Sequence, residues 1–115
     1  MNFSIVYLDD EADLCELLKE FLSSGSVSVH IFTTAEEAIR FCEESPPDLV
    51  FIDYRLRDTT GVEVAGKLDP SIAKVLMTGE LSPPEDDCFE HIIHKPFRLT
   101  EVKRLLDTCY LNPQK

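Results

Sequence analysis

Three acidic residues, one hydroxyl and one amine stand where short apolar segments of the chain end. They are Asp9, Asp10, Asp53, Thr78 and Lys95. Because the carboxyl ends of parallel strands meet at one edge of an open sheet, we expect these side chains to gather into one site. Carboxylates suit a hard divalent cation, and a hydroxyl with an ammonium suits phosphoryl oxygens. The pattern therefore predicts a site for a divalent metal and a phosphoryl group.

Asp53 carries the strongest chemical signal, because it directly follows Leu-Val-Phe-Ile, a segment expected deep in the core. A carboxylate can attack phosphorus and form an acyl phosphate once its negative charge is neutralised. A metal would supply positive charge on one side and Lys95 on the other. Taken singly, an Asp9–Asp10 pair or a lysine is more often solvated charge. The joint placement at successive strand ends carries the prediction.

The elements that must position these residues alternate between strand and helix. Apolar and alternating segments predict strands over 3–8, 27–32, 48–52, 72–77 and 91–94. Helical spacing predicts helices over 12–23, from Thr34 to before Pro46, over 61–68 and over 99–111, with Leu17, Phe21, Phe41 and Leu105 in the core. This alternation predicts a flavodoxin-like three-layer α/β/α sandwich whose five-stranded parallel sheet has the order 2-1-3-4-5.

Composition narrows the class of protein. The length of 115 residues predicts one domain over residues 1–115. A formal net charge of −11 argues against direct binding to nucleic acid or to an anionic membrane surface. The chain has no apolar run near ~20 residues and no basic leader before the first strand. Its four cysteines are far apart and form no C-x-x-C pair, which favours a reducing cytoplasm.

The ordered motifs resemble the receiver domain of two-component response regulators. The matching pieces are Val6–Glu11, Asp48–Asp53, Gly61, Met77–Gly79 and Lys95–Phe97, which span almost the whole chain. The resemblance implies that Asp53 is the phosphoacceptor in a reaction that depends on Mg²⁺ or Mn²⁺. It also implies that Asp10 binds the metal directly, that Asp9 acts mainly through a water, and that the backbone carbonyl of Arg55 is a further ligand.

The resemblance also implies roles for the remaining residues and for partners. Thr78 would be the switch hydroxyl, and Lys95 would bind the phosphoryl group and precede a cis Pro96. The donor would be the phosphohistidine of a sensor histidine kinase or phosphotransfer protein. The output would pass to a downstream protein or to a linked effector domain that this chain does not contain. Such a module catalyses its own phosphorylation and dephosphorylation but is not a turnover enzyme.

The chain departs from the family pattern on the side that normally carries output. Ile92 stands where an aromatic residue is usual, and isoleucine is stiff at χ1. The stretch from Thr78 to Lys95 is shorter than usual, which predicts a short or irregular fourth helix within residues 79–90. Arg55 and Glu80 flank the expected acyl phosphate with opposite charges. If they pair across its mouth, they should slow its hydrolysis.

Two other functions remain open at this point. A haloacid-dehalogenase-like phosphatase also uses an aspartyl nucleophile, but it needs an acid two residues later, where this chain has Arg55. A receiver-like docking module that is never phosphorylated is the second alternative. The complete set of five site residues argues against it, whereas Ile92 and the short 79–90 stretch favour it.

Overall fold

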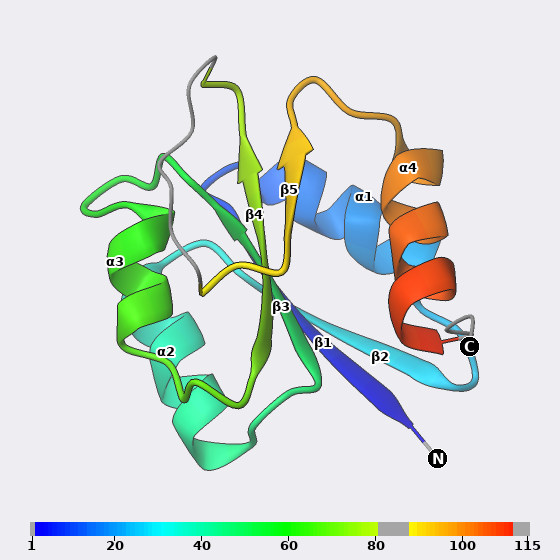
Figure 1. The fold of residues 1–115 in the computed structure, drawn as a ribbon, viewed down its shortest axis with the longest axis horizontal. Helices are drawn as coiled ribbons and strands as arrows, with labels where there is room; N and C mark the ends of the chain where they lie inside the picture. Colours follow the sequence, from blue (N-terminus) through cyan, green and yellow to red (C-terminus); the bar gives the residue numbers. More distant parts are fainter. Residues whose placement is uncertain (1, 81–87, 112–115) are drawn as a thin grey trace.

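The structure is a computed structural model that describes residues 2–80 and 88–111. Within these residues the chain forms a five-stranded sheet in which every neighbouring pair is parallel, in the order β2-β1-β3-β4-β5 (Figure 1). The strands are β1 (Phe3–Leu8), β2 (Val27–Phe32), β3 (Leu49–Asp53), β4 (Ala73–Thr78) and β5 (His91–His94). The predicted fold class and strand order are confirmed.

Helices cover both faces of the sheet (Figure 1). They are α1 (Ala12–Leu22), α2 (Ala35–Glu44), α3 (Gly61–Gly66) and α4 (Leu99–Leu106), and a π-helical segment, Asp107–Leu111, continues α4. One apolar cluster joins α1 and α4 to the sheet, and a second joins α2 and α3 to its opposite face. No helix in the described part of the chain is long and apolar enough to cross a membrane.

The central strands are apolar on both sides because both faces of the sheet are covered. Along β1, Ile5 and Tyr7 enter one cluster while Val6 and Leu8 enter the other. All four of these side chains are fully buried. A strand buried on both faces has no wet side for a polar residue. Carboxylates are therefore placed at the ends of β1 and β3, and Asp9, Asp10 and Asp53 stand at the carboxyl end.

Local signals fix the turns that bring the chain back to this end. Thr34 caps α2 by accepting a hydrogen bond from the Glu37 N–H at 3.4 Å, and Thr60 caps α3 in the same way through the Glu63 N–H. Gly61, the first residue of α3, packs closely against the end of β3. A Cβ atom there would lie 2.7 Å from the backbone oxygen of Asp53, so only glycine fits without a shift.

Two predicted core positions on α1 are wrong. Leu17 is 49% exposed and Phe21 is 40% exposed, whereas Cys15, Leu18 and Leu22 are buried. At 100° per residue the apolar residues of α1 span an arc wider than the face that meets the sheet, so its edge stays in solvent. Phe41 and Leu105 are partly buried and pack against the two apolar clusters.

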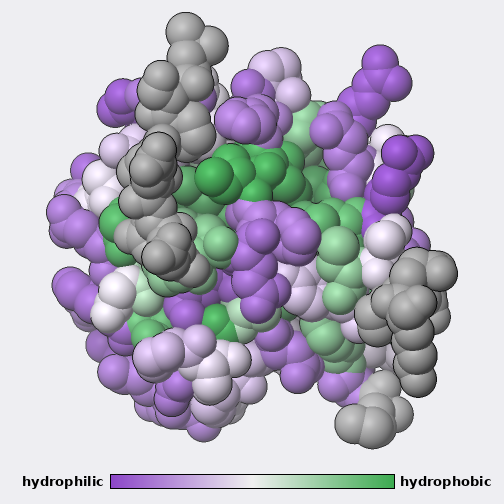
Figure 2. Space-filling model, viewed as in Figure 1, coloured by the Kyte–Doolittle hydropathy of each residue, from purple (hydrophilic) through white to green (hydrophobic). Residues whose placement is uncertain are grey.

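The departures predicted for the output side are only partly visible. Most of the predicted irregular fourth helix falls on residues 81–87, which lie outside the described residues. Ile92 on β5 is 40% exposed, and Figure 2 shows apolar surface gathered over the β4–β5 part of the sheet. The predicted helix over 99–111 is confirmed in position, with its last five residues in π-helical form.

Candidate functional site

A pocket of about 370 Å³ lies at the carboxyl edge of the sheet. It is lined by residues from four connections of the chain: Asp10, Glu11, Asp53, Tyr54, Arg55, Thr78, Gly79, Glu80 and Lys95. Four of the five residues singled out from the sequence line this pocket. The fifth, Asp9, is fully buried, and its carboxylate forms an ion pair with Lys95, which lines the pocket.

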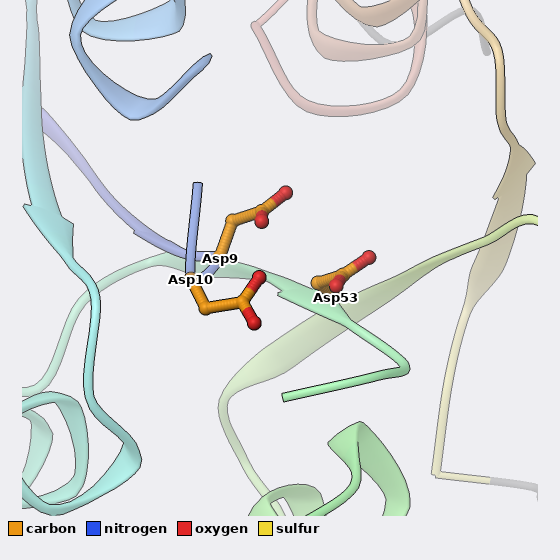
Figure 3. A group of neighbouring side chains, drawn as sticks. All are labelled: Asp9, Asp10 and Asp53. Atoms are coloured by element: carbon orange, nitrogen blue, oxygen red, sulfur yellow. The ribbon is translucent and has the colours of Figure 1, made fainter. Parts of the chain in front are cut away.

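Three carboxylates converge at the pocket. Asp9 and Asp10 follow the end of β1 and Asp53 ends β3, and Figure 3 shows the three carboxylates as neighbours at this edge of the sheet. One oxygen from each lies within 4.8 Å of the other two. Oxygen ligands at such spacing, with a part of the set open to the pocket, fit a hard divalent cation such as Mg²⁺ or Mn²⁺. These three carboxylates therefore fit the predicted divalent metal.

Lys95 bridges two of these carboxylates. Its Nζ lies 2.8 Å from Asp53 Oδ1 and 3.0 Å from Asp9 Oδ2. Its backbone N–H donates to the Thr78 carbonyl oxygen at 2.7 Å, and the bond to Pro96 is cis, as predicted. Burial lowers the pKa of Lys95, but the hydrogen bonds that its ammonium donates to Asp53 and Asp9 outweigh this effect and raise the pKa above its ordinary value. The ammonium therefore stays charged.

Burial makes ionisation of the Asp53 carboxylate unfavourable. The residue is only 6% exposed, and burial raises its pKa to about 6. The hydrogen bond from Lys95 opposes this shift, whereas the negative charge of Asp9 adds to it. One ammonium does not balance three carboxylates, so the pocket attracts a further cation.

The Asp9 carboxylate is held by three donors. Oδ2 accepts hydrogen bonds from the Tyr7 hydroxyl at 3.1 Å and from Lys95 Nζ at 3.0 Å, and Oδ1 accepts one from the Glu11 N–H at 3.0 Å. The Cys15 thiol donates to the Asp9 backbone oxygen at 3.3 Å. Burial, with the nearby Asp9 charge, raises the pKa of Cys15 to about 12, which keeps this thiol protonated.

Sequence reasoning missed Tyr7 and Glu11 as parts of the site. A signal for Tyr7 was present, because residues two apart on a strand point to the same face, which places Tyr7 beside Asp9. No comparable signal exists for Glu11, whose contribution is a backbone N–H at the turn into α1. Such a contact depends on the turn geometry and not on the side-chain type.

Thr78, Glu80 and Arg55 form the outer side of the pocket. Thr78 is 1% exposed, and its Oγ1 accepts a hydrogen bond from the Glu80 N–H at 3.0 Å. The Arg55 Nε lies 2.7 Å from Glu80 Oε2. The predicted pairing of these two opposite charges is therefore present. It links the segment after β3 to the segment after β4 across the mouth of the pocket.

The fold and the pocket together define a class: flavodoxin-like α/β proteins with an acidic site at the carboxyl edge of the sheet. Within that class, the chain belongs to the response regulator receiver domain family, whose model matches residues 5–107. The resemblance drawn from the sequence motifs is confirmed.

Relatives with curated descriptions are regulators. Over 113 residues the chain is 27% identical to the regulatory protein VanR of Enterococcus faecium, covering 89% of this chain and 47% of that protein. Over 68 residues it is 34% identical to PhoP of Bacillus subtilis, described as the alkaline phosphatase synthesis transcriptional regulatory protein, covering 59% of this chain and 28% of the relative. The chain spans less than half the length of these relatives.

Solved structures support the fold. A CheY-like response regulator receiver domain from Methanospirillum hungatei superposes with a TM-score of 0.83 at 23% identity, covering 93% of this chain and 92% of the other. A CheY-like receiver domain from Methylobacillus flagellatus gives a TM-score of 0.82 at 18% identity, covering 93% and 98%. At these identities the similarity concerns the fold alone.

Proposed function

We propose that this receiver domain accepts a phosphoryl group on Asp53 and acts as a signalling switch or a phosphorelay module. The observation that carries the proposal is the placement of Lys95 Nζ 2.8 Å from Asp53 Oδ1, at the floor of a pocket with two further carboxylates. The single receiver unit extends over residues 1–115.

The transfer is a nucleophilic substitution at phosphorus. An oxygen of Asp53 attacks the phosphorus, and the new O–P bond forms as the bond from phosphorus to the donor's imidazole nitrogen breaks. The nitrogen keeps the electron pair and takes a proton from solvent. Because attack requires the ionised carboxylate, the positive charge around Asp53 decides how readily the reaction occurs.

Residues of the pocket would hold a divalent cation, which supplies positive charge to the phosphoryl oxygens. Asp10 and Asp53 face the pocket and are the proposed direct ligands, together with the backbone carbonyl of Arg55. Asp9 is buried and already accepts three hydrogen bonds, so it would help to hold the cation mainly through a metal-bound water.

Lys95 and Thr78 would hold the transferred group. Lys95 donates to Asp53 before transfer and is placed to donate to a phosphoryl oxygen after it. The Thr78 hydroxyl reaches the same pocket from the end of β4. A hydroxyl here donates to a phosphoryl oxygen only after a small rearrangement, because its oxygen now accepts from the Glu80 N–H. Thr78 is thus the proposed link between phosphorylation and the β4 side of the molecule.

Partners follow from the same chemistry. The proposed donor is a phosphohistidine on a sensor histidine kinase or on a phosphotransfer protein, met in the cytoplasm. The proposed target is a downstream protein or an effector domain on the same polypeptide, since the curated relatives are more than twice as long. The formal charge of −11 disfavours direct contact with nucleic acid.

The test is the intact mass of the protein after incubation with acetyl phosphate and Mg²⁺. We expect one added phosphoryl group in the wild type and none in Asp53→Ala or in EDTA. No adduct in the wild type, together with failure to bind beryllofluoride, would contradict the proposal and favour the docking-only module. Beryllofluoride binding without an adduct would indicate an acyl phosphate that is lost too fast to trap.

A further inference from the structure

We propose that Tyr7 is a positioning residue of the acidic site, whose buried hydroxyl fixes the Asp9 carboxylate and thereby sets the affinity for the divalent cation. The inference rests on the proposed function, because it concerns the cation at the same site. It adds a residue that lies outside the pocket lining and one layer deeper in the core.

Tyr7 is fully buried in the middle of the core, and its ring packs 6.3 Å from the ring of Phe51, centroid to centroid. Its hydroxyl donates to Asp9 Oδ2 at 3.1 Å. A buried hydroxyl without a partner is unfavourable, so this hydrogen bond is the reason that a tyrosine is tolerated at this depth.

Three hydrogen-bond donors hold the Asp9 carboxylate. Tyr7 and Lys95 share Oδ2, and the Glu11 N–H holds Oδ1. These donors fix the plane of the carboxylate before a cation arrives. Because Asp9 is 0% exposed, bulk water cannot replace a missing donor. Loss of the hydroxyl leaves Lys95 as the remaining described donor to Oδ2.

The hydrogen bond from Tyr7 also affects the rest of the site, because Asp9 shares Lys95 with Asp53. Lys95 Nζ is divided between Asp9 Oδ2 at 3.0 Å and Asp53 Oδ1 at 2.8 Å. Without the Tyr7 hydroxyl, Asp9 draws Lys95 more strongly, and the arrangement of all three carboxylates changes. Groups that orient metal-binding carboxylates in this way typically change metal affinity by roughly 10–100-fold when they are removed.

The test compares Mg²⁺ dissociation constants by calorimetry for the wild type, Tyr7→Phe and Phe51→Leu. Tyr7→Phe removes only the hydroxyl, and we expect it to weaken Mg²⁺ binding roughly tenfold. Phe51→Leu disturbs the same core and keeps the hydroxyl, so it should lower the melting temperature without moving the dissociation constant more than twofold. A Tyr7→Phe constant within twofold of the wild type would overturn the proposal.

A second measurement keeps the proposal testable if Tyr7→Phe does not fold. In wild-type protein labelled at the tyrosine ¹³Cζ, the Tyr7 signal should shift during Mg²⁺ titration with the dissociation constant of the Asp10 amide. Tyr110 is the control, because its ring contacts Phe3 and His91, which begin β1 and β5 at the edge of the sheet opposite to the acidic site. An unmoved Tyr7 signal overturns the assignment.

The two proposals fail differently. If the wild type binds no Mg²⁺ at all, both the metal-dependent function and the role of Tyr7 are overturned. If the wild type binds Mg²⁺ and the variant binds it equally well, only the role of Tyr7 is lost.

Discussion

The side chains of the site carry an excess of negative charge. Three carboxylates lie within 4.8 Å of one another, and Lys95 is the cation that contacts two of them. Asp53, the proposed phosphoacceptor, is buried, which raises its pKa to about 6. A site built this way is stabilised when a divalent cation enters, and it leaves the attacking oxygen close to its positive neighbours.

The raised pKa of Asp53 gives a test of this charge balance by stability. The folded protein binds the Asp53 proton more tightly than the unfolded chain, so ionisation destabilises the fold above about pH 6 and the penalty disappears as the pH falls toward about 4. In buffer with EDTA, Asp53→Asn should therefore raise the free energy of unfolding at about pH 8 by roughly 1–3 kcal/mol.

The same variant should have a much smaller effect at about pH 4, where Asp53 is protonated in the folded protein and only partly ionised in the unfolded chain. Urea denaturation at the two pH values measures the difference, and Asp48→Asn is a matched control away from the pocket. An Asp53→Asn protein that is less stable than the wild type at the higher pH would contradict the charge argument.

The ion pair between Arg55 and Glu80 predicts a slow loss of the phosphoryl group. The two side chains meet at 2.7 Å across the mouth of the pocket, where a water must enter to attack the acyl phosphate. Arg55→Ala should open that mouth and speed autodephosphorylation several-fold, as measured by the decay of the phosphorylated mass. Arg57→Ala removes the same charge outside this pocket and should leave the rate unchanged. Equal decay rates in the wild type, Arg55→Ala and Arg57→Ala would show that the Arg55–Glu80 ion pair does not slow the hydrolysis.

Sequence reasoning at this scale succeeded where residue type and strand position coincide. Asp9, Asp10, Asp53, Thr78 and Lys95 were expected at one sheet edge, and the structure brings them there. The hydrogen bonds that orient them were not predictable in the same way. The contact from Tyr7 to Asp9 depends on how two side chains turn in the core, and the contact from the Glu11 N–H to Asp9 depends on the geometry of the turn into α1.

Among the elements, the connection from β3 to α3 is the tightest part of the site. Gly61 N–H donates to the Tyr54 carbonyl oxygen at 2.8 Å, and its Cα lies against the end of β3. A methyl group at this position would meet the Asp53 backbone oxygen at 2.7 Å and both Ile52 and Leu76 at 3.1 Å. The close approach of α3 therefore fixes the backbone of Asp53, the proposed phosphoacceptor.

Gly61→Ala should consequently lower the free energy of unfolding by about 1–3 kcal/mol. Gly66→Ala is the control in the same helix, because a Cβ there meets nothing within 4 Å, and we expect it to be neutral or stabilising by up to about 1 kcal/mol. Urea denaturation of both variants gives the comparison. A Gly61→Ala protein as stable as the wild type would show that the loop relaxes freely.

Helix α1 offers a second comparison, between two adjacent leucines. Leu18 is fully buried, so Leu18→Ala should cost about 2–5 kcal/mol of unfolding free energy. Leu17 is 49% exposed, and Leu17→Ala should cost less than about 1 kcal/mol. Chemical denaturation distinguishes the two, and equal losses would place Leu17 in the core after all.

The order of the elements was predictable because each strand is an apolar segment and each helix has a clear period and end signal. Their exposed edges were not, as Leu17 and Phe21 show. The amphipathic period identifies which residues are apolar, but the width of the buried face depends on how a helix sits on the sheet. The change to π-helical form at Asp107–Leu111 likewise has no signal in the spacing.

The whole molecule is a response regulator receiver domain with an acidic site at the carboxyl edge of its sheet. The chain matches the family model over residues 5–107, and its relatives include longer regulators. Strand order and layer structure followed from the alternation of elements, because parallel strands need helical crossovers on both faces. The prediction of a short or irregular fourth helix stays a prediction, because most of it falls on residues 81–87, outside the described part of the chain.

The most direct test of the central claim is to identify the phosphorylated residue chemically. Protein treated with acetyl phosphate and Mg²⁺ is reduced with borohydride, which converts an aspartyl phosphate to homoserine, and is then digested and sequenced by tandem mass spectrometry. We expect homoserine at position 53 alone, and none in protein kept in EDTA. Homoserine at position 9 or 10, or none at any position in protein that also fails to bind beryllofluoride, would contradict the proposal.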